Sequence, residues 1–220
     1  AHGLIMAGDI MVNRKVIIKV GTQVSEDSLI EVVKKLPFAS RGGIKLEHAL
    51  NELNLDVSSL IALDIGASTG GFTDCLLQKG VSRVYAIDVG YGQLDYKLRR
   101  DARVTVMDKT NAHYPLVLQE KVNLEVVDVS FISITRVIPN LIEHLKPSGY
   151  IIVLLKPQFE AEKQEVGKGG VIKDPVTHAV ILGRFILWAV KNRLRLRGMI
   201  ESPITGAEGN HEFLFWLMPC

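Results

Sequence analysis

Cysteine, aromatic residues and long apolar runs are all scarce in this chain of 220 residues. Its two cysteines, Cys75 and Cys220, cannot build a disulfide framework, which fits a reducing compartment and predicts a cytoplasmic protein. The apolar runs have the length of β-strands and fall far short of the roughly 20 residues that a membrane span needs. No signal peptide opens the sequence. The sequence therefore predicts neither a membrane protein nor a secreted protein rich in disulfides.

Net charge is scarce as well. The 26 basic and 24 acidic residues leave a formal charge of +2, which does not by itself indicate a nucleic-acid partner. Basic residues nevertheless cluster locally, at positions 14–15, 99–100 and 191–197. The six histidines have no spacing typical of metal ligands, so we expect no metal site. The overall composition is that of one ordinary globular domain with a small appendage.

What the sequence does contain is a glycine-rich turn between an apolar run and a helix start. Residues 63–74 read Leu-Asp-Ile-Gly-Ala-Ser-Thr-Gly-Gly-Phe-Thr-Asp. Glycines in such a turn allow bare backbone N–H groups to approach a nucleotide. A second apolar run ends at Asp88, 22 positions after Gly66, where a doubly wound fold places the acid that binds a ribose diol. The pattern favours a nucleoside-type cofactor over a purely structural turn.

Strand-like and helical patterns alternate from residue 40 to about residue 217. Short aliphatic or β-branched runs predict strands at 61–65, 83–88, 103–107, 122–128, 150–155, 195–201 and 212–217. Helical patterns lie between them, at 71–79, 92–100, 131–145 and 174–191. Such alternation predicts a parallel sheet that is covered on both faces.

The last two predicted strands are joined only by a short loop, residues 202–210. A loop of this length suits a hairpin and excludes a helical crossover. A parallel sheet that ends in an antiparallel hairpin resembles the methyltransferase variant of the Rossmann-like α/β fold, with seven strands and an antiparallel last strand. We therefore expect this fold for a main domain that spans residues 37–220.

Residues 1–36 are predicted to form a separate, small β unit. Alternating apolar residues predict short strands between positions 8 and 33, which are too few to bury a core alone. The unit resembles the second half of an S4-type RNA-binding domain, whose Gly-Asp-x-x-Val-Asn motif is matched by Gly8, Asp9, Val12 and Asn13. The helical first half of such a domain is absent from the sequence. The alternative is a β-hairpin that only packs against the main domain.

Four charged residues lie beside apolar runs of the main domain. Asp128 and Lys156 end predicted strands, Glu212 opens the last one, and Lys45 lies in a helical segment before the first. A charge next to a buried strand is costly unless it has a partner, so each is either a solvated strand end or a functional group. The carboxyl ends of parallel strands form the edge where such sheets bind ligands. Two lysines and two acids at one edge favour a shared site.

These four residues resemble the Lys-Asp-Lys-Glu tetrad of ribose 2′-O-methyltransferases. The segments around them resemble the hemolysin A (TlyA) family of that group, which carries an FtsJ-like methyltransferase domain: Ser-Arg-Gly-Gly-Ile-Lys-Leu, the glycine-rich turn, Asp-Val-Ser-Phe-Ile-Ser, Lys-Pro-Gln-Phe-Glu and Glu-Gly-Asn-His-Glu-Phe. The resemblance covers nearly the whole chain. It implies an S-adenosylmethionine-dependent enzyme that methylates ribose 2′-hydroxyls of ribosomal RNA. Its partners would be ribosomal RNA or ribosomal subunits, with neither a membrane nor a metal involved.

The resemblance also implies individual roles. Asp88 would accept both ribose hydroxyls of the cofactor, Asp64 would help to hold its ammonium group, and Asp108 would meet the adenine amino group, although a glutamate is expected at that position. The other residues expected to bind the cofactor are Gly66, Ala67, Ser68, Gly70 and Phe72. Contacts with RNA are expected from Asn13, Arg14, Lys15 and Arg41.

The acceptor hydroxyl must lose its proton during methyl transfer, and Lys156 is the candidate for assisting this step. It could act as a neutral base or as a cation that stabilises the developing alkoxide. The acids Asp128 and Glu212 favour its charged form, whereas burial favours its neutral form, and the sequence leaves both roles open. Lys45 would orient the ribose or a neighbouring phosphate.

Three other interpretations are weaker. NAD as the cofactor is disfavoured by the terminal hairpin and by the lack of a second domain for a substrate. An RNA-binding protein without turnover is disfavoured by the intact tetrad. A membrane-active hemolysin would need an apolar segment, and the best candidate, residues 179–190, is short and interrupted by Arg184.

Overall fold

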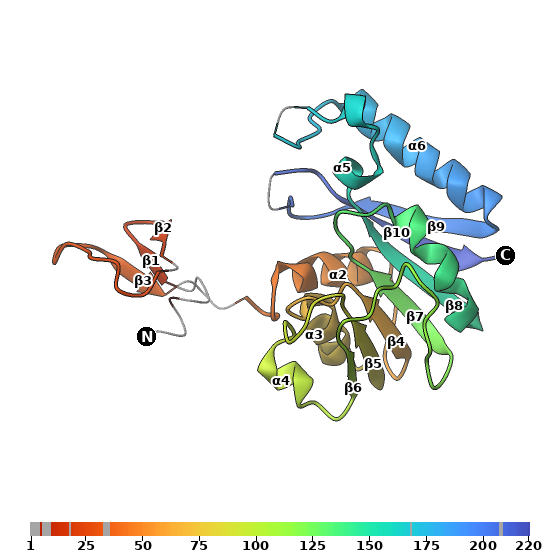
Figure 1. Ribbon diagram of the computed structural model, residues 1–220, viewed down its shortest axis with the longest axis horizontal. Coiled ribbons are helices and arrows are strands. Elements are labelled where there is room, and N and C mark those ends of the chain that lie inside the picture. Colours follow the sequence, from red (N-terminus) through yellow and green to blue (C-terminus); the bar gives the residue numbers. More distant parts are fainter. Residues whose placement is uncertain (1–4, 6–9, 18, 33–35, 168, 207–208) are drawn as a thin grey trace. The chain divides into compact units, whose positions relative to one another are not determined.

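The computed structural model describes residues 5, 10–17, 19–32, 36–167, 169–206 and 209–220. The chain divides into two compact units, Ala1–Pro37 and Phe38–Cys220 (Figure 1). No helix in the described ranges is both long enough and apolar enough to cross a membrane.

The first unit contains a three-stranded antiparallel sheet with the order β2-β1-β3. The strands are β1 (Ile10–Val12), β2 (Lys15–Val16) and β3 (Ile30–Val32). Asn13 and Arg14 form the turn between β1 and β2, and both have a positive φ, which asparagine tolerates well. The side-chain Oδ1 of Asn13 accepts a hydrogen bond from the backbone N–H of Leu29 at 2.9 Å. Asn13 therefore ties the turn to the segment before β3, while Gly8 and Asp9 of the same motif lie outside the described residues.

The second unit is built on a seven-stranded sheet with the order β6-β5-β4-β7-β8-β10-β9. The strands are β4 (Ile61–Ile65), β5 (Arg83–Ile87), β6 (Val104–Met107), β7 (Val122–Val127), β8 (Leu145–Leu155), β9 (Leu194–Glu201) and β10 (Phe213–Pro219). The first five run parallel, whereas β10 lies between β8 and β9 and is antiparallel to both. The predicted Rossmann-like fold and its terminal hairpin are confirmed. Strand β8 begins five residues earlier than predicted, because Leu145 already pairs with Val122 of β7.

The helices depart more from the prediction. The α-helices of this unit are α2 (Arg41–Glu52), α3 (Gly71–Gln78), α4 (Tyr96–Arg99), α5 (Pro157–Glu160) and α6 (Pro175–Lys191). The predicted helix 92–100 is reduced to α4, because Gly92 has a left-handed φ and the side chain of Asp95 caps the helix only from Tyr96 onward.

The predicted helix 131–145 is wrong. Three short 3₁₀ helices replace it: η1 (Ile134–Arg136), η2 (Ile138–Asn140) and η3 (Ile142–His144). Pro139 lies in the middle of this stretch, where it has no N–H to donate and its ring would collide with the carbonyl four residues earlier in an α-helix. A fourth 3₁₀ helix, η4 (Lys163–Glu165), follows α5.

Each face of the sheet carries its own core. Helices α2, α3 and α4 contribute to one core, through residues such as Leu46, Leu76 and Leu98. Helix α6 and the 3₁₀ segment contribute to the other, through residues such as Ile138 and Phe185. With both faces covered, the edge formed by the carboxyl ends of the parallel strands is the place left for a ligand site.

Strand β7 carries a buried carboxylate within the second of these cores. Glu125 is fully buried, and neither of its carboxylate oxygens has a hydrogen-bond partner among the described residues. Its neighbours across the sheet are Leu63 of β4 and Ile151 of β8, both apolar. Desolvation by these surroundings raises the pKa of Glu125 well above its usual range, because burial disfavours the charged form.

Candidate active site

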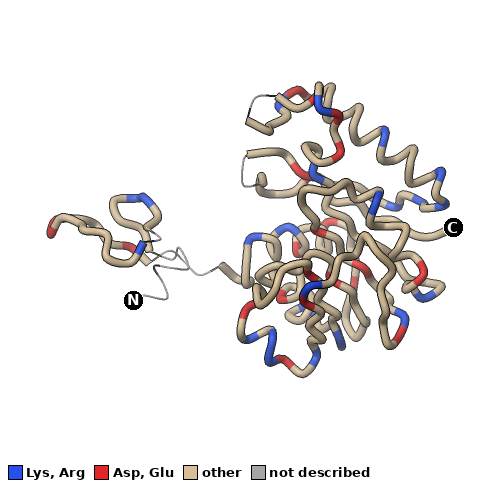
Figure 2. Tube along the Cα trace, viewed as in Figure 1, with Lys and Arg blue, Asp and Glu red and all other residues tan. Residues whose placement is uncertain are grey.

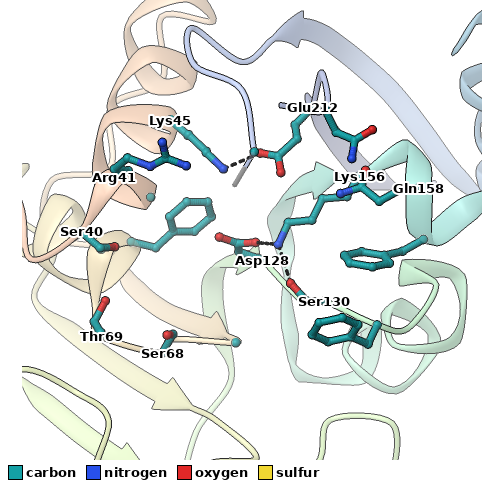
Figure 3. Close-up of a pocket in the computed structure, with 18 of the residues that line it drawn as sticks. Ser40, Arg41, Lys45, Ser68, Thr69, Asp128, Ser130, Lys156, Gln158 and Glu212 are labelled. Carbon is teal, nitrogen blue, oxygen red and sulfur yellow. Dashed lines mark hydrogen bonds and ion pairs between the residues drawn. The ribbon is translucent and has the colours of Figure 1, made fainter. Parts of the chain in front are cut away.

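A cavity of about 690 Å³ opens at the carboxyl edge of the sheet. Its walls come from the start of α2, the glycine-rich turn after β4, the ends of β7 and β8, and the loop before β10. All four tetrad residues line it, as Figure 3 shows: Lys45, Asp128, Lys156 and Glu212. The chain therefore brings together four charged residues that are far apart in the sequence.

The tetrad forms two ion pairs. The Nζ atom of Lys156 lies 2.6 Å from Oδ1 of Asp128, in an ion pair without the geometry of a directed hydrogen bond, and donates a hydrogen bond to Oγ of Ser130 at 2.9 Å. Lys45 donates to the Oε2 atom of Glu212, and both side chains are almost fully buried. The two pairs are neighbours, because Glu212 precedes Phe213 of β10, which pairs with Leu155, the residue before Lys156. The second pair is shielded from water, so removal of one partner would leave the other as an uncompensated buried charge.

The backbone explains why Asp128 meets the glycine-rich turn. Its N–H donates to the carbonyl of Ile65 at 2.9 Å, which extends the pairing of β7 with β4 by one residue. Gly66 has a left-handed φ of 82°, and a Cβ atom there would lie 2.3 Å from the carbonyl oxygen of Asp128. Only glycine combines this φ with so close an approach.

A second cavity, of about 350 Å³, adjoins the first. The two share lining residues at their junction, namely Gly66, Ser68, Asp128, Ser130 and Phe131. Asp88, at the end of β5, lines only the second cavity. Its carboxylate accepts hydrogen bonds from the N–H of Ser68 at 2.8 Å and from the N–H of Gly90 at 2.7 Å. Asp88 thus presents an anion to this cavity and also holds two of its loops together.

The other residues predicted to bind a cofactor occupy different places. Ala67 and Phe72 line the first cavity, whereas Gly70 caps α3, where a Cβ atom would collide with Leu98. Asp64 is fully buried behind the cavity wall. Its Oδ2 accepts a hydrogen bond from the hydroxyl of Thr73 at 2.6 Å, and its Oδ1 has no partner among the described residues.

Burial raises the pKa of Asp64 to about 7. Asp108 lines neither cavity. Its carboxylate accepts hydrogen bonds from the guanidinium of Arg99 at 2.9 Å and from the N–H of Gly92 at 3.3 Å. The hydrogen bond from Arg99 lowers the pKa of Asp108. Contact of Asp108 with adenine stays a prediction.

Of the residues predicted to contact RNA, Arg41 lines the first cavity and donates to the carbonyl of Thr205 at 3.4 Å. Asn13, Arg14 and Lys15 belong to the first unit, and their contact with RNA stays a prediction.

Sequence reasoning did not single out two aromatic residues at the first cavity. The ring of Phe131 is 91% exposed, and its centroid lies 5.2 Å from that of Phe159. An exposed phenylalanine with a left-handed φ of 64° is costly in solvent and in backbone strain, so it suits a surface that packs against a ligand. The signal was present, because Phe131 and Phe159 lie within the segments Asp-Val-Ser-Phe-Ile-Ser and Lys-Pro-Gln-Phe-Glu.

Two further side chains, also missed, join the loops around the cavity. The carboxylate of Glu160 accepts hydrogen bonds from the hydroxyl of Ser133 at 2.6 Å and the N–H of Ile134 at 2.8 Å, which links α5 to the loop after β7. Burial raises the pKa of Glu160. Asn210 accepts from the N–H of Ile172 at 3.0 Å and donates to the carbonyl of Gly170 at 2.9 Å. These contacts hold the segments next to Asp128, Lys156 and Glu212 in place.

The described residues contain no group of three or more histidines, cysteines, aspartates or glutamates arranged to hold a metal ion. The chemistry available to the first cavity is that of two ammonium and two carboxylate groups, beside a second cavity that carries the carboxylate of Asp88. Such a site can hold a nucleoside in the second cavity and act on a hydroxyl in the first.

Comparisons with known proteins find relatives over nearly the whole chain. "Hemolysin A" from Brachyspira hyodysenteriae is 42% identical, over 97% of this chain and 90% of that protein. "16S/23S rRNA (cytidine-2'-O)-methyltransferase TlyA" from Mycobacterium tuberculosis is 40% identical, over 99% of this chain and 82% of that protein. A solved structure from Streptococcus thermophilus, of a protein described as a hemolysin, superposes with a TM-score of 0.83 at 39% identity, over 97% of this chain and 79% of that one.

The family model of the FtsJ-like methyltransferases matches residues 38–218, which is nearly all of the second unit. The match includes both cavities, the tetrad and the terminal hairpin. This chain therefore belongs to the FtsJ-like methyltransferase family, and its relatives include proteins named TlyA and hemolysin A.

Proposed function

We propose that this protein methylates the 2′-hydroxyl of a ribose in ribosomal RNA and takes the methyl group from S-adenosylmethionine. The observation that carries the proposal is the position of the Lys156–Asp128 ion pair. Lys156 lines the first cavity and Asp128 lines both, so the pair stands where a ligand of one cavity meets a ligand of the other. The relative from M. tuberculosis is named for ribose methylation of 16S and 23S rRNA.

The residues present fit S-adenosylmethionine. The second cavity has the size of a small-ligand pocket, and the Asp88 carboxylate is suited to accept hydrogen bonds from a ribose diol. Asp64 lines neither cavity, so its unpartnered Oδ1, behind the glycine-rich turn, is suited to hold the cofactor's ammonium group through water. When bound, the cofactor supplies an electrophilic methyl group.

The chain's own residues would prepare the acceptor. Asp128 and Ser130 fix the Nζ atom of Lys156, which can then hold the ribose hydroxyl in line. Lys156 would either remove the hydroxyl proton or stabilise the developing alkoxide. Lys45, buried against Glu212, would orient the ribose or its phosphate. The exposed ring of Phe131 at the junction gives the acceptor's base a surface on which to stack.

The direct test is the transfer of labelled methyl from S-adenosylmethionine to purified ribosomal subunits. We expect the label in RNA, on a ribose, where a 2′-O-methyl group makes the next phosphodiester resistant to alkali. Label on a base or on a ribosomal protein would contradict the proposal. RNA binding without any transfer would favour a protein that has lost turnover.

Replacement of Asp88 by alanine should weaken S-adenosylmethionine binding by about 1.5–3 kcal/mol, the scale of lost hydrogen bonds to a charged group. Isothermal calorimetry measures the affinity, and a thermal melt checks that the loops held by Asp88 stay folded. Asp101→Ala is a matched control, because Asp101 pairs with Arg103 outside both cavities. Unchanged affinity in a folded Asp88→Ala variant would remove Asp88 from the cofactor site.

A further inference from the structure

The loop after β5, helix α4 and the loop after β6 carry tyrosines and cations that the proposed reaction does not use. Tyr91 is 73% exposed and Tyr96 is 69% exposed. Large aromatic side chains lose hydrophobic stabilisation when they stay in water, so two of them on one short stretch call for an explanation.

Each tyrosine is paired with a cation. The Nζ atom of Lys109 lies 4.8 Å from the ring centroid of Tyr91. The guanidinium carbon of Arg100 lies 5.4 Å from the ring centroid of Tyr96, and Arg100 also donates to the Tyr96 hydroxyl at 2.8 Å. Both pairs combine a flat π surface with a positive charge.

The two pairs belong to one surface, which we call the tyrosine–cation surface (Tyr91, Tyr96, Arg100 and Lys109). Asp108 connects them, because its carboxylate accepts from Gly92, next to Tyr91, and from Arg99, next to Arg100. Figure 2 shows the basic residues along α4 and the adjoining loops.

This surface adjoins the cofactor cavity. The N–H of Lys109 donates to the carbonyl of Gly90, and the N–H of Gly90 donates to the carboxylate of Asp88. The N–H of Asp95, which caps α4, donates to the carbonyl of Thr69 in the glycine-rich turn. The surface is therefore fixed to the same loops that shape both cavities.

We infer that the tyrosine–cation surface binds an unpaired stretch of RNA next to the nucleotide that is methylated, an inference that rests on the proposed function. Exposed aromatic rings stack on bases of any sequence, and neighbouring cations neutralise phosphates. Between residues 95 and 109, basic residues outnumber acidic ones, and both Arg99 and Arg103 already have acidic partners. Arg100 and Lys109 contact rings, which leaves their charge available to a phosphate.

The test compares variants of the whole protein in methyl transfer to protein-free ribosomal RNA at subsaturating concentration. The double variant Tyr91→Ala/Tyr96→Ala should lower kcat/KM by about 30-fold or more, the scale for loss of two stacked bases. Arg100→Ala and Lys109→Ala should each flatten the dependence of the logarithm of RNA affinity on the logarithm of salt concentration by about 0.7. The affinity for S-adenosylmethionine should stay unchanged in all of them.

Two controls separate stacking from other effects. Tyr96→Phe keeps the ring and loses only the hydroxyl that accepts from Arg100, so its activity should stay near wild type. Arg195→Ala removes an exposed cation from β9, outside the surface, and should also stay near wild type.

Several results would overturn the inference: wild-type kcat/KM in the double tyrosine variant, an equal loss in Arg195→Ala or Tyr96→Phe, or a parallel loss of cofactor affinity. A loss seen with ribosomal subunits but not with free RNA would assign the surface to a ribosomal protein and would overturn the inference too.

The wild-type protein separates failure of this inference from failure of the proposed function. If the wild-type protein itself transfers no methyl to RNA, the proposed function fails. If the wild type is active and the variants match it, only this inference fails.

Discussion

Replacement of Lys156 by alanine should remove nearly all methyl transfer and leave the affinity for S-adenosylmethionine close to that of the wild type. The Nζ atom of Lys156 lies in the first cavity, where it is held by Asp128 and Ser130, two residues that line both cavities. Proton transfer by a positioned side chain contributes roughly 10²- to 10⁴-fold to a rate, and electrostatic stabilisation of an alkoxide has a similar scale. Single-turnover transfer of labelled methyl to ribosomal RNA measures this loss.

The matched control is Lys146→Ala. Lys146 lies on the same strand, β8, outside both cavities, and donates a hydrogen bond to Asn123. Its removal should leave the transfer rate unchanged. A wild-type rate in Lys156→Ala would exclude Lys156 from the mechanism and would leave the tetrad without a role in transfer.

Lys156→Arg distinguishes a base from a fixed cation. A guanidinium keeps its proton near neutral pH, so it can supply charge but cannot accept a proton. If Lys156 acts as a base, arginine should be almost as damaging as alanine, and the wild-type rate should rise with pH and then level off. If it acts as a cation, arginine should retain a measurable fraction of the rate, and the profile should be flat until the lysine loses its proton.

Replacement of Glu125 by leucine should stabilise the protein by about 1–3 kcal/mol near neutral pH, the scale of a buried polar group left unsatisfied. Glu125 is fully buried between Leu63 and Ile151, without a hydrogen-bond partner among the described residues. Chemical denaturation at several pH values measures the free energy of unfolding. Activity should not change, because Glu125 lines neither cavity.

The raised pKa of Glu125 also predicts how the stability of the protein changes with pH. The pKa of Glu125 is raised in the folded state above its ordinary value of 4.5, so the folded protein binds more protons than the unfolded chain above that pH. The contribution of Glu125 to stability is therefore fully present below about pH 4.5 and is lost as the pH rises. The advantage of Glu125→Leu over the wild type should grow across the same range.

Glu125→Gln is the control, because glutamine keeps the shape and polarity but does not titrate. Glu125→Gln should abolish the contribution of Glu125 to the pH dependence of the free energy of unfolding. It should stabilise the protein less than Glu125→Leu does. Burial also raises the pKa of Asp64, to about 7, so Asp64 makes the free energy of unfolding fall with pH in every variant. The contribution of Glu125 is therefore read from the difference between each variant and the wild type. A pH-independent difference between Glu125→Gln and the wild type would show that Glu125 does not titrate as inferred.

The sequence was enough to predict the main features of the sheet and the convergence of the tetrad, because both depend on where the strands begin and end. A charged residue directly after a buried strand lies at the edge of the sheet. Parallel strands have their carboxyl ends at the same edge, so Asp128 and Lys156 lie close together. The loop before Phe213 was too short for a crossover, which determined the direction of the last strand. Each of these inferences used residues that are close together in the sequence.

The contacts that could not be predicted join distant loops. Glu160 bonds to Ser133 and Ile134, 27 and 26 positions away, and Asn210 bonds to Ile172, 38 positions away. Their geometry depends on how several loops pack at once, which no local pattern encodes. The prediction of a helix over 131–145 failed for a different reason, because apolar spacing outweighed the breaking effect of Pro139.

The antiparallel insertion of β10 also determines when, during synthesis of the chain, the site can form. Lys45, in the first helix of the second unit, forms its ion pair with Glu212. Glu212 is synthesised only after strands β4 to β9, just before β10. Until β10 arrives, β8 and β9 have no hydrogen-bonded neighbour between them. A nascent chain therefore cannot assemble the Lys45–Glu212 pair before this hairpin is made. If the tetrad has its proposed role, we expect methyl transfer only from chains that include the hairpin.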